Sequence, residues 1–148
     1  MPTHAEKKIL PYTPEQMFAL VADVEAYPEF LPWCLDCTIR QHTKLKNGEK
    51  IIADLTIGYK IFRETFTSEV VLDRKESTID VQYVRGPFKY LNNHWVFKPA
   101  GANRCQVGFF VDFEFRTAFL QKVMGLFFNE AVRRMIVAFE SRAKDLYT

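Results

Sequence analysis

The residues with the clearest chemical potential are Cys34 and Cys37, which are spaced as Cys-x-x-Cys in the segment PWCLDC. This spacing occurs in redox pairs and in zinc sites. A redox pair needs a helix N-terminus to lower the thiol pKa, whereas this pair follows Pro32 and Trp33 and enters an expected strand. Positions i and i+3 of a strand point to opposite faces. A zinc site needs about four ligands, and Cys105 is distant in sequence. The sequence therefore favours a structural role for both cysteines.

The three histidines do not indicate a metal or catalytic site. His4, His42 and His94 lack the spacing of metal ligands. Alternation along an expected strand places His94 on the face opposite Trp95, so we expect a solvated side chain rather than a general base. The sequence shows no phosphate-binding glycine loop, nucleophile–base set or nucleic-acid motif.

One acidic residue is placed differently from the others. Most acids fall on the outer face of the expected sheet, but Glu64 shares a face with Phe62 and Phe66. A buried carboxylate without a partner is costly, so we expect a partner such as Arg63 or Arg85 near a rim. The alternative is acid–base catalysis, which needs titratable groups that converge on a substrate.

Composition limits the classes of function. The 148 residues are expected to form a single domain, 1–148, whose core needs neither disulfides nor a structural metal. The net charge of +2 gives little support for DNA binding. No apolar run reaches the roughly 18 residues that cross a bilayer, no targeting segment is recognisable, and three cysteines suit a reducing compartment. We therefore expect a cytoplasmic protein, with the periphery of the inner membrane as a second location.

Hydrophobic periodicity predicts the order of the elements. A strand at 4–10 is followed by a helix that begins at the capping signals of Thr13 to Gln16 and ends before Pro28, and a further helical turn is expected at 29–31. From 35 to 115 the period is two. Turn signals at 47–48, 58–59, 74–76, 86–87 and 99–101 divide this region into six antiparallel strands. A helix capped by Thr117 then runs from Arg116 to Lys144, about 45 Å long at 1.5 Å per residue.

This order predicts an α+β protein with the helix-grip fold. In that arrangement a curved seven-stranded antiparallel sheet surrounds a long C-terminal helix, and one or two short helices follow the first strand. The helix is long enough to span the concave face of the sheet. Because twist and curvature hold the two surfaces apart, a cavity often remains between them.

Four segments, together with this order, resemble the coenzyme Q-binding family of START-like proteins. They are YPEFLPWC at 27–34, GPFKYLNNHW at 86–95, VDFEF at 111–115 and FFNEAVRRMIVAFESRA at 127–143. The family is often grouped with polyketide cyclases and dehydrases, and it is also similar to a bacterial ribosome-association toxin. The resemblance covers nearly the whole chain, and YPEFLPWC is its most specific motif.

The resemblance changes the interpretation of the aromatic residues, 14 of which are Phe. By itself a Phe-rich face is ordinary core. The family implies an apolar tunnel for an isoprenoid quinone such as ubiquinone, or for a related polyprenyl lipid, in a non-catalytic carrier or chaperone that supports quinone synthesis or respiratory electron transport. The candidate lining residues are Trp33, Phe62, Phe66, Tyr83, Trp95, Phe109, Phe113, Met124, Phe127, Met135 and Phe139.

Two other functions stay open. A ribosome-binding regulator would use the basic face of the last helix, formed by Lys122, Arg133, Arg134 and Arg142, and the same charges suit transient contact with an anionic membrane. A cyclase or dehydratase would need at least two convergent polar groups in the cavity. Gly125 costs this helix about 1 kcal/mol relative to Ala, and we expect it to permit close packing or a slight bend at the cavity mouth.

Overall fold

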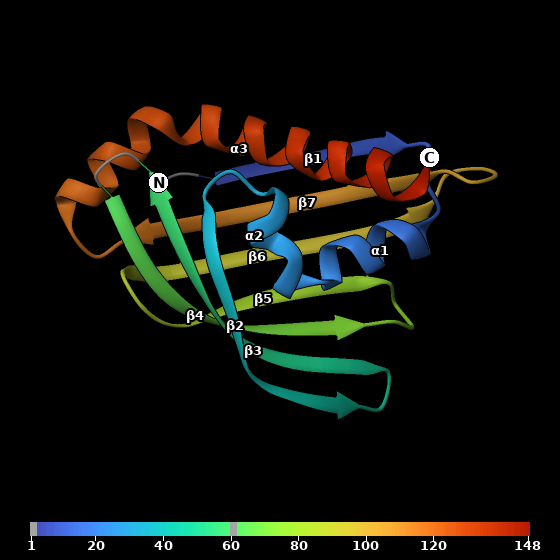
Figure 1. Ribbon diagram of the computed structural model, residues 1–148, viewed down its shortest axis with the longest axis horizontal. Helices are drawn as coiled ribbons and strands as arrows, with labels where there is room; N and C mark the ends of the chain where they lie inside the picture. The colour runs from blue at the N-terminus through green and yellow to red at the C-terminus, as the bar shows by residue number, and fades with distance from the viewer. Residues whose placement is uncertain (1–2, 60–61) are drawn as a thin grey trace.

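In the computed structural model, a seven-stranded antiparallel sheet curves around a long C-terminal helix (Figure 1). The structure describes residues 3–59 and 62–148, apart from the side chains of Tyr59 and Phe62. A 3-10 turn at Val24–Ala26 joins two short helices. The elements in chain order are β1 (Thr3–Leu10), α1 (Pro14–Ala22), α2 (Tyr27–Phe30), β2 (Cys34–Leu45), β3 (Gly48–Tyr59), β4 (Phe62–Asp73), β5 (Thr78–Arg85), β6 (Phe88–Pro99), β7 (Cys105–Phe115) and α3 (Ala118–Tyr147). The predicted helix-grip fold is confirmed.

The sheet has a simple topology. Its strand order is β1-β7-β6-β5-β4-β3-β2, so β2 to β7 form a meander of consecutive neighbours. The first strand of the chain closes the other edge by pairing with β7. In Figure 1 the three helices lie on the same, concave face of the sheet. Any space between sheet and helix is therefore bounded by strands on one side and by α3 on the other.

Local capping fixes where the two longer helices begin. The Thr13 hydroxyl accepts a hydrogen bond from the Gln16 backbone N–H at 3.1 Å, and the Gln16 side chain accepts one from the Thr13 N–H at 2.9 Å. Pro14 occupies the first helical position. At the start of α3, the Thr117 hydroxyl accepts from the Leu120 N–H at 3.2 Å. Both predicted caps are confirmed, and each satisfies backbone donors that a helix start leaves unpaired.

Phe88, at the start of β6, is the centre of an aromatic cluster. The rings of Phe66, Tyr83, Phe113 and Phe115 lie with their centroids 4.6 to 5.6 Å from the Phe88 ring. The Phe88 backbone N–H also donates to the Tyr83 hydroxyl at 3.1 Å. The Phe88 side chain is only 4% exposed. Its ring contacts connect β4, β5, β6 and β7 at one end of the core.

The turn predicted at Gly58 and Tyr59 is wrong, because both residues belong to β3. Gly58 pairs with Arg63 of β4, and its N–H donates to the carbonyl oxygen of Trp33 at 2.9 Å. Gly58 therefore has a partner on each side, Arg63 of β4 and Trp33 just before β2, and this pairing outweighs the turn preference of glycine.

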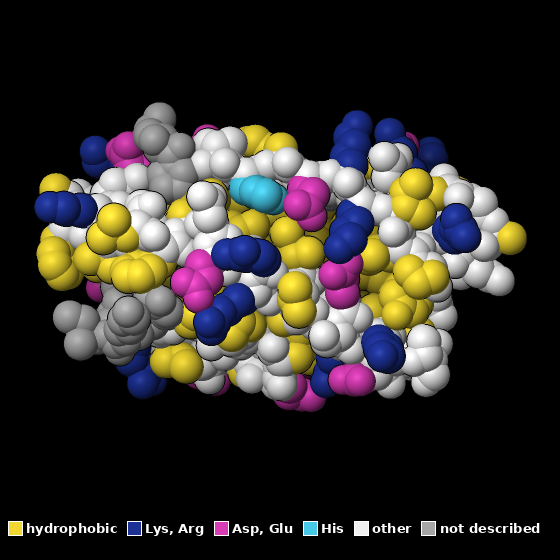
Figure 2. Space-filling view, turned by 90° about the horizontal axis from the view of Figure 1, so that it is seen from above, with side chains coloured by type: hydrophobic (Ala, Val, Ile, Leu, Met, Phe, Trp, Pro, Cys, Tyr) yellow, Lys and Arg dark blue, Asp and Glu magenta, His cyan; other side chains and the backbone are white. Residues whose placement is uncertain are grey.

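The outer surface of α3 mixes apolar and cationic side chains. Phe119 and Leu126 are 64% and 74% exposed, and Lys122 and Arg133 are exposed along the same helix. Figure 2 looks onto this side of the molecule and shows hydrophobic side chains interspersed with Lys and Arg. None of the helices within the described residues is long and apolar enough to cross a membrane.

Candidate functional site

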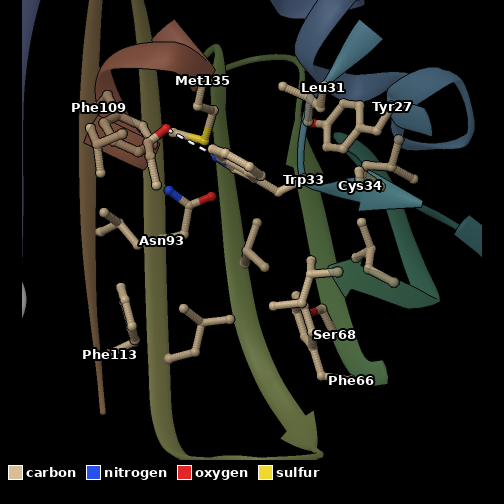
Figure 3. A pocket seen from close by; sticks show the side chains of 18 of the residues that line it. Tyr27, Leu31, Trp33, Cys34, Phe66, Ser68, Asn93, Phe109, Phe113 and Met135 are labelled. Carbon is tan, nitrogen blue, oxygen red and sulfur yellow. Dashed lines mark hydrogen bonds between the residues drawn. The ribbon is translucent and has the colours of Figure 1, made fainter. Parts of the chain in front are cut away.

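A cavity lies between the concave face of the sheet and α3 (Figure 3). It consists of two adjoining compartments of about 270 and 210 Å³. Both compartments are lined by Trp33, Phe66, Val111, Phe113 and Met135, so they share walls. Small-molecule sites are typically mostly apolar cavities of roughly 300–1,000 Å³. The two compartments together have the size and composition of such a site.

The strands supply one wall because alternate residues point inward. On four neighbouring strands the inward positions follow an unbroken period of two. They are Phe66, Ser68 and Val70 on β4, Ile79 and Val81 on β5, Leu91, Asn93 and Trp95 on β6, and Phe109, Val111 and Phe113 on β7.

The opposite wall comes from α3. Its inward residues recur every three or four positions, as one face of a helix requires. They include Met124, Phe128, Val132, Met135 and Phe139. Methionine side chains are unbranched and polarizable, so Met124 and Met135 can adapt to ligands of irregular shape.

Most of the residues proposed from the sequence surround this cavity. Phe127 reaches only the smaller compartment. Tyr83 is not among the lining residues, because its ring packs 5.5 Å from Phe88 and its hydroxyl accepts the Phe88 N–H. The side chain of Phe62 lies outside the described residues. The candidates brought together are Trp33, Phe66, Trp95, Phe109, Phe113, Met124, Phe127, Met135 and Phe139. That they contact a ligand stays a prediction.

Trp33 lies at the edge of the cavity, between the start of β2 and α3. Its indole N–H donates to the carbonyl oxygen of Ala131 at 3.4 Å. The guanidinium of Arg134 lies 5.7 Å from the ring centroid, within the range of a cation–π contact. Figure 3 shows the indole beside Met135. Trp33 therefore connects the loop before β2 to the middle of α3.

Sequence reasoning missed the polar members of the wall, Ser68 and Asn93. Ser68 is fully buried, and its hydroxyl has no hydrogen-bond partner among the described residues. Asn93 is half-buried; its amide nitrogen donates to the Phe110 carbonyl oxygen at 2.8 Å, and its amide oxygen accepts from the Trp95 indole at 3.0 Å. The alternation that identified Phe66 and Trp95 as inward also identifies these two residues, since each has the same parity along its strand.

The two cysteines of β2 lie on the same face, so their predicted separation to opposite faces is wrong. The pairing of β2 with β3 slips between Cys34 and Asp36, which leaves Leu35 as an extra residue, a β-bulge. Cys34 is opposite Ile57 and Cys37 is opposite Leu55. Both partners line the cavity. All three cysteines of the chain are free thiols.

Burial, rather than a catalytic partner, controls the chemistry of these thiols. Removal from water raises the pKa of Cys34 to about 11 and that of Cys37 to about 12. Because the thiolate is the reactive form, both groups are inert near neutral pH. The same shift lets the folded chain hold the thiol protons more tightly than the unfolded chain. The free energy of unfolding therefore decreases as pH rises above the ordinary thiol pKa of 9.0.

Alkylation by iodoacetamide at pH 8 is expected to be at least about a hundredfold slower for Cys34 and Cys37 than for unfolded cysteine, because so little thiolate is present. The rate should keep rising up to about pH 11 at Cys34 and up to about pH 12 at Cys37. Mass spectrometry of the labelled peptides measures each site, and the same protein in urea is the control. A rate that levels off near pH 8.5 in the folded protein would contradict the raised pKa values.

Glu64 does not have the predicted arginine partner. It is half-buried near the start of β4, opposite Ile57, and in the part of the chain that the structure describes it forms no ion pair with Arg63 or Arg85. Arg63 is its direct neighbour and points to the other face, while Arg85 pairs with Thr67, three residues further along β4. Partial exposure lets water solvate the carboxylate, so no ion pair is required.

The close packing predicted at Gly125 is also wrong. A Cβ at this position would meet no atom within 4 Å, and the residue is exposed on the outer side of α3. The inward positions nearby are Met124 and Phe128, so Gly125 points away from the cavity. That it permits a slight bend of the helix stays a prediction.

The remaining titratable groups lie away from the cavity or are engaged. His94 is exposed, and its Nδ1 lies 2.5 Å from an oxygen of Asp80. The hydroxyl of Tyr27 donates to the carbonyl oxygen of Val21, and burial raises the pKa of Tyr27 well above its ordinary value. Among the described residues, no cluster of three His, Cys, Asp or Glu side chains is arranged to hold a metal ion. The described lining of the larger compartment includes no Asp, Glu, His, Lys or Arg.

A curved seven-stranded sheet around a long C-terminal helix, with an apolar cavity between them, defines a START-like protein. The chain belongs to the family described as polyketide cyclase/dehydrase and lipid transport, which matches residues 10–140. The resemblance predicted from the sequence is thereby confirmed at the level of the family.

Two curated relatives are similar over nearly the whole chain. The ribosome association toxin RatA of Rickettsia prowazekii is 37% identical in an alignment of 142 positions that covers 94% of each chain. The mitochondrial coenzyme Q-binding protein COQ10 homolog B of Xenopus laevis is 32% identical in an alignment of 155 positions that covers 97% of this chain and 59% of that one.

Two solved structures share the fold. An 18 kDa protein of Caulobacter crescentus is 37% identical, with a TM-score of 0.82 over 99% of both chains. The Zhui aromatase/cyclase of a Streptomyces species has a TM-score of 0.81 over 97% of this chain and 93% of its own. At 15% identity, the second likeness concerns the fold alone.

Proposed function

We propose that this protein binds an isoprenoid quinone such as ubiquinone, or a related polyprenyl lipid, and carries it without making or breaking a bond. The observation that carries the proposal is the apolar cavity of two adjoining compartments between the sheet and α3. Each methylene of a lipid tail that leaves water contributes about 0.8 kcal/mol before the costs of binding. The similarity to a coenzyme Q-binding protein supports the quinone as the ligand class.

The surface next to the smaller compartment suits exchange of such a ligand at an anionic membrane. Met124 and Phe127 line that compartment from α3. On the outer side of the same turns, Phe119 and Leu126 are exposed beside Lys122. Apolar and cationic side chains on one helix surface favour binding at the interface of an anionic bilayer. We therefore place ligand entry and exit at this end of α3.

Lipid extraction tests the proposal directly. The protein, purified gently from its native host, is expected to release a quinone or polyprenyl lipid into organic solvent, identified by mass spectrometry. The matched control is the same protein after delipidation, which should take up added ubiquinone and release it again. Repeated absence of such a lipid, together with failure to bind added ubiquinone, would rule out the proposed function.

Ribosome binding is the second candidate, because a relative named as a ribosome association toxin is 37% identical to this chain. The exposed cations Arg133 and Lys144 of α3 could contact RNA phosphates. Such binding weakens steeply with salt, by orders of magnitude between 50 and 200 mM when several phosphates are contacted. Co-sedimentation with ribosomal subunits at both salt concentrations tests this candidate. If the protein co-sediments equally with lipid vesicles that contain no protein and with ribosomal subunits, specific ribosome binding is ruled out.

Catalysis ranks behind binding because the cavity offers few groups that could transfer a proton. Its polar side chains Ser68 and Asn93 lie on β4 and β6, with β5 between them. The amide of Asn93 is already hydrogen-bonded to two protein groups. A cyclase or dehydratase would need convergent acid–base groups within hydrogen-bond reach of one substrate.

A further inference from the structure

The two compartments of the cavity differ in polarity. Ser68 and Asn93 line only the larger compartment. Within the described lining of the smaller compartment the walls are hydrocarbon and aromatic, apart from the backbone of Gly58, the indole of Trp33 and Glu130 at its edge. A ligand with one polar end and one apolar end is therefore matched in only one direction, with its polar end in the larger compartment.

Asn93 brings a side-chain amide of fixed orientation to the wall of the larger compartment. The amide nitrogen uses one hydrogen for the Phe110 carbonyl oxygen, and the amide oxygen accepts from the Trp95 indole, so both ends of the amide have assigned partners. A flip of the amide would break both bonds. Since a primary amide carries two N–H groups, one donor remains. Figure 3 shows the Asn93 amide projecting from β6 into the cavity, on the side opposite Ser68.

Neighbouring polar groups cannot take up this donor role as readily. The indole N–H groups of Trp33 and Trp95 already donate to protein oxygens, and so does the hydroxyl of Tyr27. The Ser68 hydroxyl has no partner among the residues that the structure describes, but it is fully buried within the β4 wall. Its presence adds polarity to the same compartment, while Asn93 is the half-buried group that a ligand can reach.

We propose that Asn93 is the polar anchor of the ligand, and that its remaining amide N–H donates a hydrogen bond to a carbonyl oxygen of the ligand head. The ligand is thus a carbonyl-bearing lipid whose head, such as a quinone ring, lies in the larger compartment. Its tail lies in the smaller compartment and is directed toward Met124 and Phe127. This inference rests on the proposed lipid binding and adds to it the orientation of the ligand and the chemistry of its head.

The test compares two ligands and two variants. Ubiquinone with two isoprene units carries carbonyl oxygens, whereas farnesene is an isoprenoid hydrocarbon without oxygen. Asn93→Leu is expected to weaken ubiquinone binding about tenfold, the effect of one lost buried hydrogen bond, and to leave farnesene binding unchanged. Asn92→Leu is the matched control, because Asn92 is the exposed neighbour on the opposite face of β6. That variant should bind both ligands as the wild type does.

A second measurement needs no variant to fold. In ¹⁵N–¹H spectra of the wild-type protein, the side-chain amide signals of Asn93 should shift when ubiquinone is added and stay in place with farnesene. If Asn93→Leu binds ubiquinone normally, or the amide signals do not respond, the anchor is wrong while lipid binding stands. If the wild type binds neither ligand, the proposed function fails and the anchor fails with it.

Discussion

Replacing Val111 by Phe is expected to reduce ubiquinone binding at least a hundredfold while the fold is retained. Val111 projects from β7 and lines both compartments, so it lies where they join. The added ring occupies space that the ligand needs. Because it enters a cavity rather than a filled core, stability should change by less than about 1.5 kcal/mol, as for a tolerated core substitution.

Quenching of tryptophan fluorescence by added ubiquinone measures this effect, since both tryptophans of the chain, Trp33 and Trp95, line the cavity. Val84→Phe is the matched control: Val84 is 52% exposed on β5, so the same change adds a ring outside the cavity. Undiminished quenching in the Val111 variant would show that the ligand does not pass between β7 and α3.

The largest effect on stability is expected from Phe88→Ala. The side chain is almost fully buried and contacts four other aromatic rings, which come from β4, β5 and β7. Truncation of a buried Phe costs about 3–5 kcal/mol, because both the transfer of the ring from water and the packing around it are lost. Urea unfolding followed by circular dichroism measures the change.

Phe119→Ala is the control for this substitution. Phe119 is 64% exposed, so its truncation should change the free energy of unfolding by no more than about 0.5 kcal/mol. Phe88→Leu should recover part of the loss. A cost below about 1 kcal/mol for Phe88→Ala would indicate that the surrounding rings collapse into the space and that Phe88 does not organise this end of the core.

Local sequence signals predicted the parts of the fold that depend on neighbouring residues. The capping box of Thr13 and Gln16 and the cap of Thr117 are complete within a few residues, so they could be recognised without tertiary contacts. The inward residues of β6 and β7 follow strict alternation over most of their length. For this reason the aromatic wall, including Trp95 and Phe113, could be predicted from the period alone.

The errors arise where distant contacts decide the backbone. A period-two pattern contains no sign of the bulge at Leu35, because the slip is defined by the partner strand β3. Tyr83 has the parity of Val81, but the irregular pairing of β4 with β5 next to Ser68 and the ring of Phe88 hold it off the cavity wall. The orientation of Gly125 could not be predicted from the residue itself, because a glycine has no side chain that favours either the buried or the exposed face of a helix.

The bulge makes residue 35 an extra residue that the sheet accommodates. Leu35 is 48% exposed, so most replacements there should be tolerated. Removing the residue would close the bulge and leave a regular ladder, in which Cys34 stays opposite Ile57 and Asp36 stays opposite Thr56. The two cysteines would then be two positions apart along a regular pleat, so both would still lie on the face that carries Leu55 and Ile57. The orientation of Cys34 and Cys37 is therefore set by their partners on β3 rather than by their spacing in the sequence.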